Sequence, residues 1–125
     1  MSWSYLESVL ARACPSFLEE WTALRRTYTP EHPPSATDFL GALRVHVVHL
    51  LREGRVAEST RLFLTLERLL GEADPILRDL LENDFLAPLA ADWRALGLDP
   101  HRVRPHLGPR ARAVWDRESA APPEA

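Results

Sequence analysis

The chain has 125 residues and a formal net charge of −3; 46% of the residues are apolar and 26% are charged. This composition is typical of one globular domain, and the negative charge argues against a protein built mainly to coat nucleic acid. No apolar run approaches the roughly 18 residues that a membrane span requires, so we expect no membrane association. A single cysteine, Cys14, cannot form an internal disulfide, and the N-terminus lacks the pattern of a signal peptide; both features favour a cytoplasmic protein.

Prolines and capping signals divide the first third of the chain into two expected helices and a loop. Ser4 with Glu7, and Ser16 with Glu19, have the spacing of a capping box. Pro15 ends or bends the first segment. The second segment carries an apolar stripe at helical spacing: Phe17, Trp21, Leu24 and Tyr28. Residues 29–36 contain three prolines, which cannot continue a helix, so a loop is predicted there.

A central pair of helices is predicted in the middle of the chain. Ser35 with Asp38 forms a third capping box, which opens a helix expected from about residue 37 to residue 53. Gly54 tolerates a positive φ and should end it, and a second helix is expected from about residue 55 to residue 70, where Gly71 stops it. The inward residues are predicted to be Phe39, Leu40, Leu43, Val47, Leu50 and Leu51 in the first helix, and Val56, Phe63, Leu66, Leu69 and Leu70 in the second. A connection this short makes the two helices antiparallel neighbours.

The last third continues the helical pattern. Asp74-Pro75 and Asp99-Pro100 each provide an N-cap followed by a proline at the first helical position. Pro88 is expected to kink or restart the chain, and the final helix carries Val114 and Trp115. We therefore predict an all-α fold, a compact single-domain helical bundle of six to eight helices around a central antiparallel pair. The domain is expected to cover residues 1–118, followed by a disordered tail at 119–125.

Three polar residues of the first central helix could bind a metal. His46, His49 and Glu53 fall within an arc of about 60° on the helix surface, and two histidines with a carboxylate are metal ligands. However, the inward stripe is centred near Leu43 and Val47, so His49 and Glu53 should face solvent as an exposed pair. We therefore expect no metal or other cofactor here, and we interpret Cys14 as a structural cysteine. A metal-dependent enzyme that uses this histidine cluster is the least favoured alternative.

The C-terminal segment 101–117 has an excess of arginine. It contains five Arg and one Asp, with two His and a Trp. Arginine beside an aromatic residue can bind nucleic acid, so a nucleic-acid-binding or regulatory protein is a second alternative. All fifteen basic residues of the chain are Arg, however, and a coding bias explains this composition without a functional role.

Segment 67–92 has the opposite charge. Its seven acids and two Arg give a local charge of −5. Some of the acids stabilise helix ends, but Glu82 and Asp84 are not explained in this way, and they alternate with apolar residues such as Phe85. An acidic surface that contains apolar side chains suits a basic protein partner. The candidate partner-binding residues are Glu72, Asp79, Glu82, Asp84 and Phe85.

Five motifs in order along residues 5–115 resemble a family of small bacterial all-helical domains of unknown function. The motifs are ACPSFLEEW, DFLGAL, EGRVAESTRLFLTLERLL, LLENDFLAPL and HLGPRARAVW. Some proteins of this family are associated with toxin-immunity genes, and the family offers no catalytic residues to transfer. The resemblance implies a stand-alone helical protein with an immunity-type role. Together with the acidic segment, it leads to the hypothesis of a non-enzymatic protein that binds and neutralises a basic toxin.

Overall fold

The structure is a computed structural model that describes residues 1–120, and this part of the chain contains helices and loops without a strand. The elements are α1 (Trp3–Ala13), α2 (Pro15–Arg25), α3 (Ala36–Arg52), α4 (Val56–Glu72), α5 (Pro75–Leu81), η1 (Glu82–Leu86), α6 (Ala87–Ala95), η2 (Pro100–Arg102), η3 (Arg104–His106) and α7 (Pro109–Ser119). The predicted all-α bundle of six to eight helices is confirmed. None of these helices is both long enough and apolar enough to cross a membrane.

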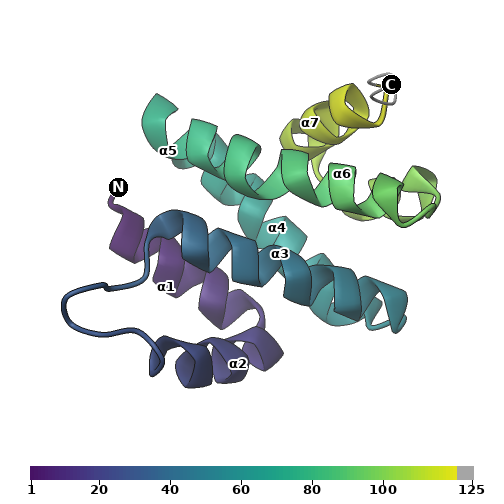
Figure 1. The fold of residues 1–125 in the computed structure, drawn as a ribbon. Coiled ribbons are helices and arrows are strands. Elements are labelled where there is room, and N and C mark those ends of the chain that lie inside the picture. The colour runs from purple at the N-terminus through teal and green to yellow at the C-terminus, as the bar shows by residue number, and fades with distance from the viewer. Residues whose placement is uncertain (121–125) are drawn as a thin grey trace.

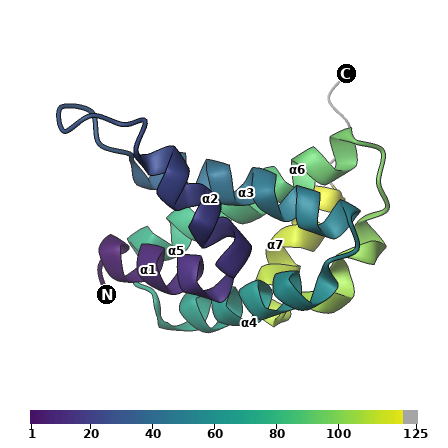
Figure 2. The same cartoon turned by 90° about the horizontal axis from the view of Figure 1, so that it is seen from below.

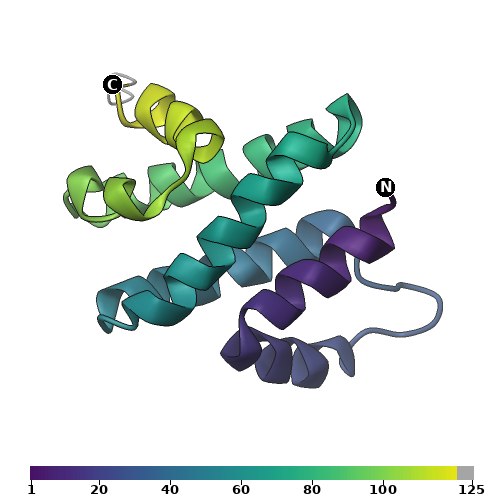
Figure 3. The same ribbon diagram turned by 180° about the vertical axis from the view of Figure 1, so that it is seen from behind.

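The two central helices, α3 and α4, join two groups of helices. On one side of them lie α1 and α2, and on the other side lie α5, α6 and α7 (Figure 1). The view from behind shows α4 running diagonally across the molecule (Figure 3), and α4 packs against α1, α3, α5 and α7. A tight turn at Gly54, which has a φ of 75°, connects α3 to α4. The central antiparallel pair is therefore confirmed.

One continuous apolar core fills the space between these helices. Every inward residue predicted for α3 is buried, and in α4 the prediction fails only for Val56, which lies near the exposed start of the helix and is 37% exposed. The predicted stripe of α2 is half right: Phe17 and Trp21 are buried, whereas Leu24 is 38% exposed. Leu24 lies at the end of α2, where the chain leaves the core for the loop visible in Figure 2.

Capping predictions are confirmed where the cap is local. The amide of Asp38 donates to Ser35 Oγ at 3.0 Å, and the amide of Ser35 donates to Asp38 Oδ2 at 2.9 Å, which completes the capping box. Asp74 caps α5 by accepting a hydrogen bond from the amide of Leu77. Asp99 caps η2 in the same way.

The two other predicted capping boxes are wrong. Ser2, not Ser4, caps α1. In α2 the first residue is Pro15, because its fixed φ already suits the start of a helix. Ser16 is consequently the second residue of α2 rather than its cap, and Cys14 occupies the cap position without a capping hydrogen bond from its own side chain.

Pro88 neither breaks the helix nor restarts it. The elements α5, η1 and α6 follow one another as one continuous rod (Figure 1). The amide of Ala87 donates to the carbonyl oxygen of Glu82, five residues back, as in a π-helix. Pro88 has no amide hydrogen and its ring would crowd the preceding turn of an α-helix. The wider π-turn lies directly before this proline and accommodates it without a break in the helix.

The C-terminal boundary differs slightly from the prediction. Helix α7 runs to Ser119, one residue beyond the expected end of the domain at residue 118. Of the predicted tail at 119–125, residues 121–125 lie outside the described part of the chain.

Candidate functional site

The acidic segment 67–92 is partly neutralised by arginines from other helices. Glu67 pairs with Arg110 at 3.3 Å and also accepts hydrogen bonds from the first amides of α7. Asp92 pairs with Arg44 at 2.8 Å. These two acids therefore stabilise the packing of α4 on α7 and of α6 on α3.

The acids proposed for partner binding form no ion pair among the described residues, but they do not all share one face. Glu82 lines a surface pocket together with Arg78 and Arg110, on the α7 side of the rod. Asp84 accepts a hydrogen bond from Thr37 Oγ1 at 2.9 Å, on the α3 side. Glu82 and Asp84 are therefore directed toward different neighbouring helices.

The prediction that Phe85 lies on the partner-binding surface is also wrong. It is 1% exposed and belongs to the core, as do Leu81 and Leu86. Phe85 follows the buried Leu81 by four residues, which is the spacing of one helix face, so it belongs to the inward stripe. A partner docked on the surface of this structure cannot contact Phe85.

An apolar residue does lie on the acidic surface, at Ile76. Its side chain is 80% exposed, more than any other large apolar residue in residues 1–120. Asp79, one helical turn further along α5, is exposed. Glu72 is exposed at the C-terminal end of α4, where a carboxylate opposes the helix dipole and so does not stabilise the helix. We call the set Glu72, Ile76 and Asp79 the α5 surface.

A second polar site, which the sequence did not reveal, lies where α2 begins. Ser16 Oγ lies 2.7 Å from His46 Nε2 on α3 and donates to Glu58 Oε1 on α4 at 2.5 Å. The amide of Ser16 donates to the same carboxylate oxygen at 2.8 Å. On its other side, His46 Nδ1 lies 2.6 Å from Glu20 Oε2. Glu58 therefore caps α2 from a neighbouring helix.

The hydrogen bonds of this site connect Ser16 and His46 with the carboxylates of Glu58 and Glu20. Because the single hydroxyl proton of Ser16 points to Glu58, His46 Nε2 must donate to Ser16 Oγ. On the other side of the ring, His46 Nδ1 faces the Glu20 carboxylate.

Burial raises the pKa of both titratable groups of the site, but the net pKa shifts of the two groups have opposite signs. Burial alone would raise the pKa of Glu58, but the hydrogen bonds from the side chain and amide of Ser16 outweigh it and hold this pKa below its usual range. Burial raises the pKa of the Cys14 thiol to about 11, and the nearby negative charge of Glu58 adds to the effect. Cys14 is therefore a thiol at neutral pH, as expected for a structural cysteine.

The distances between Ser16, His46 and Glu20 resemble those of a nucleophile, a base and an orienting acid. The hydrogen bond between Ser16 and Glu58 argues against nucleophilic catalysis. The Ser16 proton is directed to Glu58 rather than to His46. The Glu58 carboxylate would also repel the negative charge that develops when a hydroxyl attacks a carbonyl.

The candidate metal ligands His46, His49 and Glu53 do not converge on one point, and His49 and Glu53 are exposed as expected. His46 turns toward α2 and α4, whereas His49 is exposed beside an apolar groove between α3 and α6. Glu53 is exposed at the end of α3. The structure brings His46 together with Cys14 and Glu58 instead, and one ligand atom from each of these three lies within 4.8 Å of the others.

The arginines of segment 101–117 are largely engaged within the protein. Arg104 forms two hydrogen bonds with Asp116 at 2.8 and 3.0 Å, and the guanidinium of Arg102 lies 5.7 Å from the ring centre of Trp93. Arg112 donates to the carbonyl oxygen of Leu107. Trp115 is buried and cannot stack on a base. The segment therefore lacks the exposed aromatic residue that the nucleic-acid hypothesis requires.

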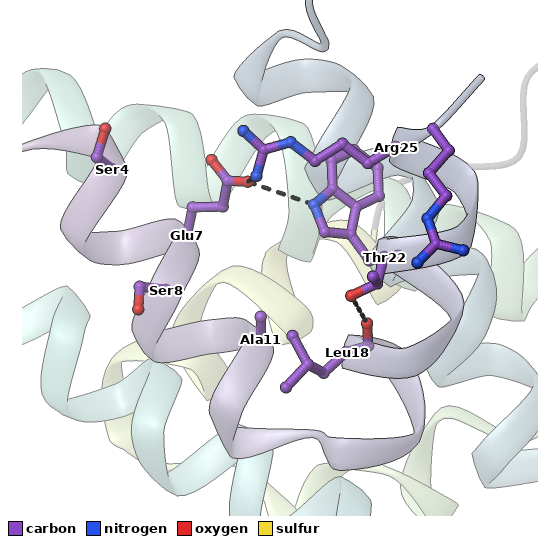
Figure 4. A pocket seen from close by; sticks show the side chains of 9 residues that line it. Ser4, Glu7, Ser8, Ala11, Leu18, Thr22 and Arg25 are labelled. Atoms are coloured by element: carbon purple, nitrogen blue, oxygen red, sulfur yellow. Dashed lines mark hydrogen bonds and ion pairs between the residues drawn. The ribbon is translucent and has the colours of Figure 1, made fainter. Parts of the chain in front are cut away.

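A pocket of about 560 Å³ opens between α1 and α2 (Figure 4). Trp21 Nε1 donates to Glu7 Oε1 at 3.3 Å across it, and Arg25 lies 3.9 Å from the same carboxylate. Glu7 is the only carboxylate among its lining residues, which include neither His nor Cys. The hydroxyls of the pocket, from Ser4, Ser8 and Thr22, form no hydrogen bond with Glu7 among the described residues, and Thr22 donates to the carbonyl oxygen of Leu18 instead.

The fold and these sites define a small all-α domain. A family model described as a domain of unknown function, DUF7674, matches residues 8–120, and the chain belongs to this family. No curated protein and no solved structure matches the chain. The expected membership of a family of unknown function is thus confirmed, whereas a bacterial origin and a link to toxin-immunity genes stay predictions.

Proposed function

We propose that this protein is a non-enzymatic protein-binding protein and that its partner docks on the α5 surface. The exposure of Ile76, at 80%, is the observation that carries the proposal. Burying such a side chain contributes about 1.5–3 kcal/mol, and this protein leaves that free energy unused in its own fold.

Charge supports a basic partner. Asp79 on α5 and Glu72 at the end of α4 are exposed and form no ion pair with another described residue. Such carboxylates speed association with a basic surface and select among partners. Asp79 and Ile76 lie on one helix, so the backbone holds the acidic and apolar groups in a fixed arrangement.

We propose further that the partner is a toxin, as the family resemblance implies. A toxin that acts on nucleic acid is basic where it meets phosphate. An acidic inhibitor bound at that surface excludes the substrate without any catalysis of its own.

Photo-crosslinking from the α5 surface tests this function. A photoreactive amino acid is placed at Ile76 in one variant and at Leu64 in a second, because Leu64 of α4 is also exposed, at 68%. Both variants are irradiated in the native host, and the crosslinked proteins are identified by mass spectrometry. We expect a basic protein to be crosslinked from position 76 and not from position 64.

The crosslinked protein is then purified and its affinity is measured. We expect Ile76→Ala to weaken binding about 5- to 30-fold, the equivalent of about 1–2 kcal/mol of lost apolar burial. If the partner is a toxin, co-expression of the wild type restores growth and Ile76→Ala restores less. Equal crosslinking from both positions, or an affinity unchanged by Ile76→Ala, contradicts the proposal.

A further inference from the structure

We propose that Cys14, His46 and Glu58 form a binding site for a transition-metal ion of the Zn²⁺ type. The site is separate from the α5 surface, so this inference does not depend on the proposed function. It revises the sequence-based expectation that no metal is bound, because the three residues come from segments that no sequence motif connects.

The donor set fits this class of ion. Cys14 supplies a sulfur, His46 an imidazole nitrogen and Glu58 a carboxylate oxygen, and zinc accepts all three, commonly with a fourth position left for water. Calcium and magnesium prefer oxygen ligands alone, so the sulfur and nitrogen argue against them.

The distances also fit. A tetrahedral zinc site places its ligand atoms about 3.4–3.6 Å from one another. Cys14 Sγ and Glu58 Oε1 are 3.5 Å apart, and the imidazole nitrogen lies within 4.8 Å of both. To complete the geometry, the His46 side chain moves by about 1 Å and the Ser16 hydroxyl moves out from between His46 and Glu58.

A carboxylate already orients the imidazole. His46 directs Nε2 toward Ser16 and Glu58, and its Nδ1 lies 2.6 Å from Glu20 Oε2. A histidine that binds a metal usually donates its second ring N–H to a carboxylate in this way.

The site is sheltered and held by three helices. Cys14 is fully buried at the junction of α1 and α2, and the Glu58 side chain is 15% exposed. Without metal, the Ser16 hydroxyl bridges His46 and Glu58. Binding of the ion replaces this bridge and releases the Cys14 thiol proton and the His46 Nε2 proton to solvent, so the affinity should rise with pH.

Titration of the full-length protein with Co²⁺ tests the site. The protein is treated with a chelator, kept reduced and titrated while its absorption spectrum is recorded. We expect one Co²⁺ per chain and a thiolate-to-cobalt charge-transfer band. Cys14→Ser should abolish the band, and His46→Gln and Glu58→Gln should each lower the affinity at least about 100-fold.

Three further variants separate metal binding from a purely structural role. His49→Ala changes an exposed histidine on the same helix and should leave binding unchanged. Ser16→Ala removes the bridging hydroxyl but no ligand, so it should bind Co²⁺ at least as tightly as the wild type. Glu20→Gln should weaken binding about 10- to 100-fold with the charge-transfer band retained.

Circular dichroism confirms that each variant is folded, and thermal unfolding with Zn²⁺ provides a second readout. We expect Zn²⁺ to raise the Tm of the wild type and not that of His46→Gln. A folded wild type with no charge-transfer band and no rise in Tm overturns the proposal. A band that persists at full affinity in both His46→Gln and Glu58→Gln overturns it as well.

Discussion

Replacement of Glu58 by alanine should destabilise the metal-free protein far more than replacement of an exposed carboxylate. Glu58 is the only acceptor within the described chain for the Ser16 amide, at 2.8 Å, and it also binds the Ser16 hydroxyl, at 2.5 Å. Loss of a helix cap costs about 1 kcal/mol, and a hydrogen bond to a charged group contributes about 1.5–3 kcal/mol. The half-exposed contact with Arg55 adds little. The expected loss is therefore about 2–4 kcal/mol.

Urea denaturation with a chelator present measures this loss without a contribution from metal. Glu58→Gln keeps an acceptor oxygen and should cost only about 1 kcal/mol. Glu53→Ala is the matched control, because Glu53 is an exposed carboxylate at the end of α3; it should change the free energy of unfolding by less than about 0.5 kcal/mol. If Glu58→Ala is as mild as this control, Glu58 does not cap α2.

The pH dependence of stability gives an independent check on Glu58. Because hydrogen bonds from Ser16 hold the pKa of Glu58 below its usual range, the folded state favours the carboxylate. Its contribution is complete above the ordinary value of about 4.3 and is lost as the pH falls through the lower, folded value. The stability difference between the wild type and Glu58→Gln should therefore shrink as the pH is lowered below about 4.3. A difference that stays constant over that range would contradict the assignment.

Three further predictions concern the core, the thiol and the surface. Trp21→Ala and Phe63→Ala should each cost about 3–5 kcal/mol in urea denaturation, since both side chains are buried, and a loss below about 1 kcal/mol would mean that these side chains do not pack in the core. Burial raises the pKa of Cys14 to about 11, so a thiol reagent at neutral pH should modify the metal-free native protein far more slowly than the urea-unfolded protein; equal rates would show that the thiol is accessible. Ile76→Ala should change the free energy of unfolding by less than about 0.5 kcal/mol, and a larger loss would show that Ile76 supports the fold.

Signals confined to a few neighbouring residues predict the fold well. The capping box of Ser35 with Asp38 and the cap at Asp74 satisfy amides within three residues, so their geometry follows from spacing alone. The inward stripe of α3 is also predictable, because its period is that of one regular helix. Pro88 is harder to interpret, since a π-turn and a break both accommodate a residue without an amide hydrogen.

The polar site at α2 could not be predicted because its partners are far apart in the chain. Ser16 has the local signature of a cap, but Glu58, 42 residues away, satisfies its amide. His46 lies at the edge of the inward stripe of α3, and only the packing of α2 decides whether it faces solvent or Ser16. On the α5 surface, the acidic residues can be predicted from the sequence because of their charge. The exposure of Ile76 cannot, because it depends on which face of the rod meets α3 and α7.

The salt dependence of partner association tests the central claim most directly. The partner crosslinked from position 76 is mixed with wild-type protein, with Asp79→Arg and with Glu53→Arg as the matched exposed control, at about 0.05 M and 0.3 M salt. The wild type and the control should associate about tenfold faster at the lower salt concentration, because exposed charges are screened less there. Asp79→Arg should associate more slowly at low salt and respond much less to added salt. Identical rates and identical salt dependence for Asp79→Arg and the wild type would show that the α5 surface does not bind the partner.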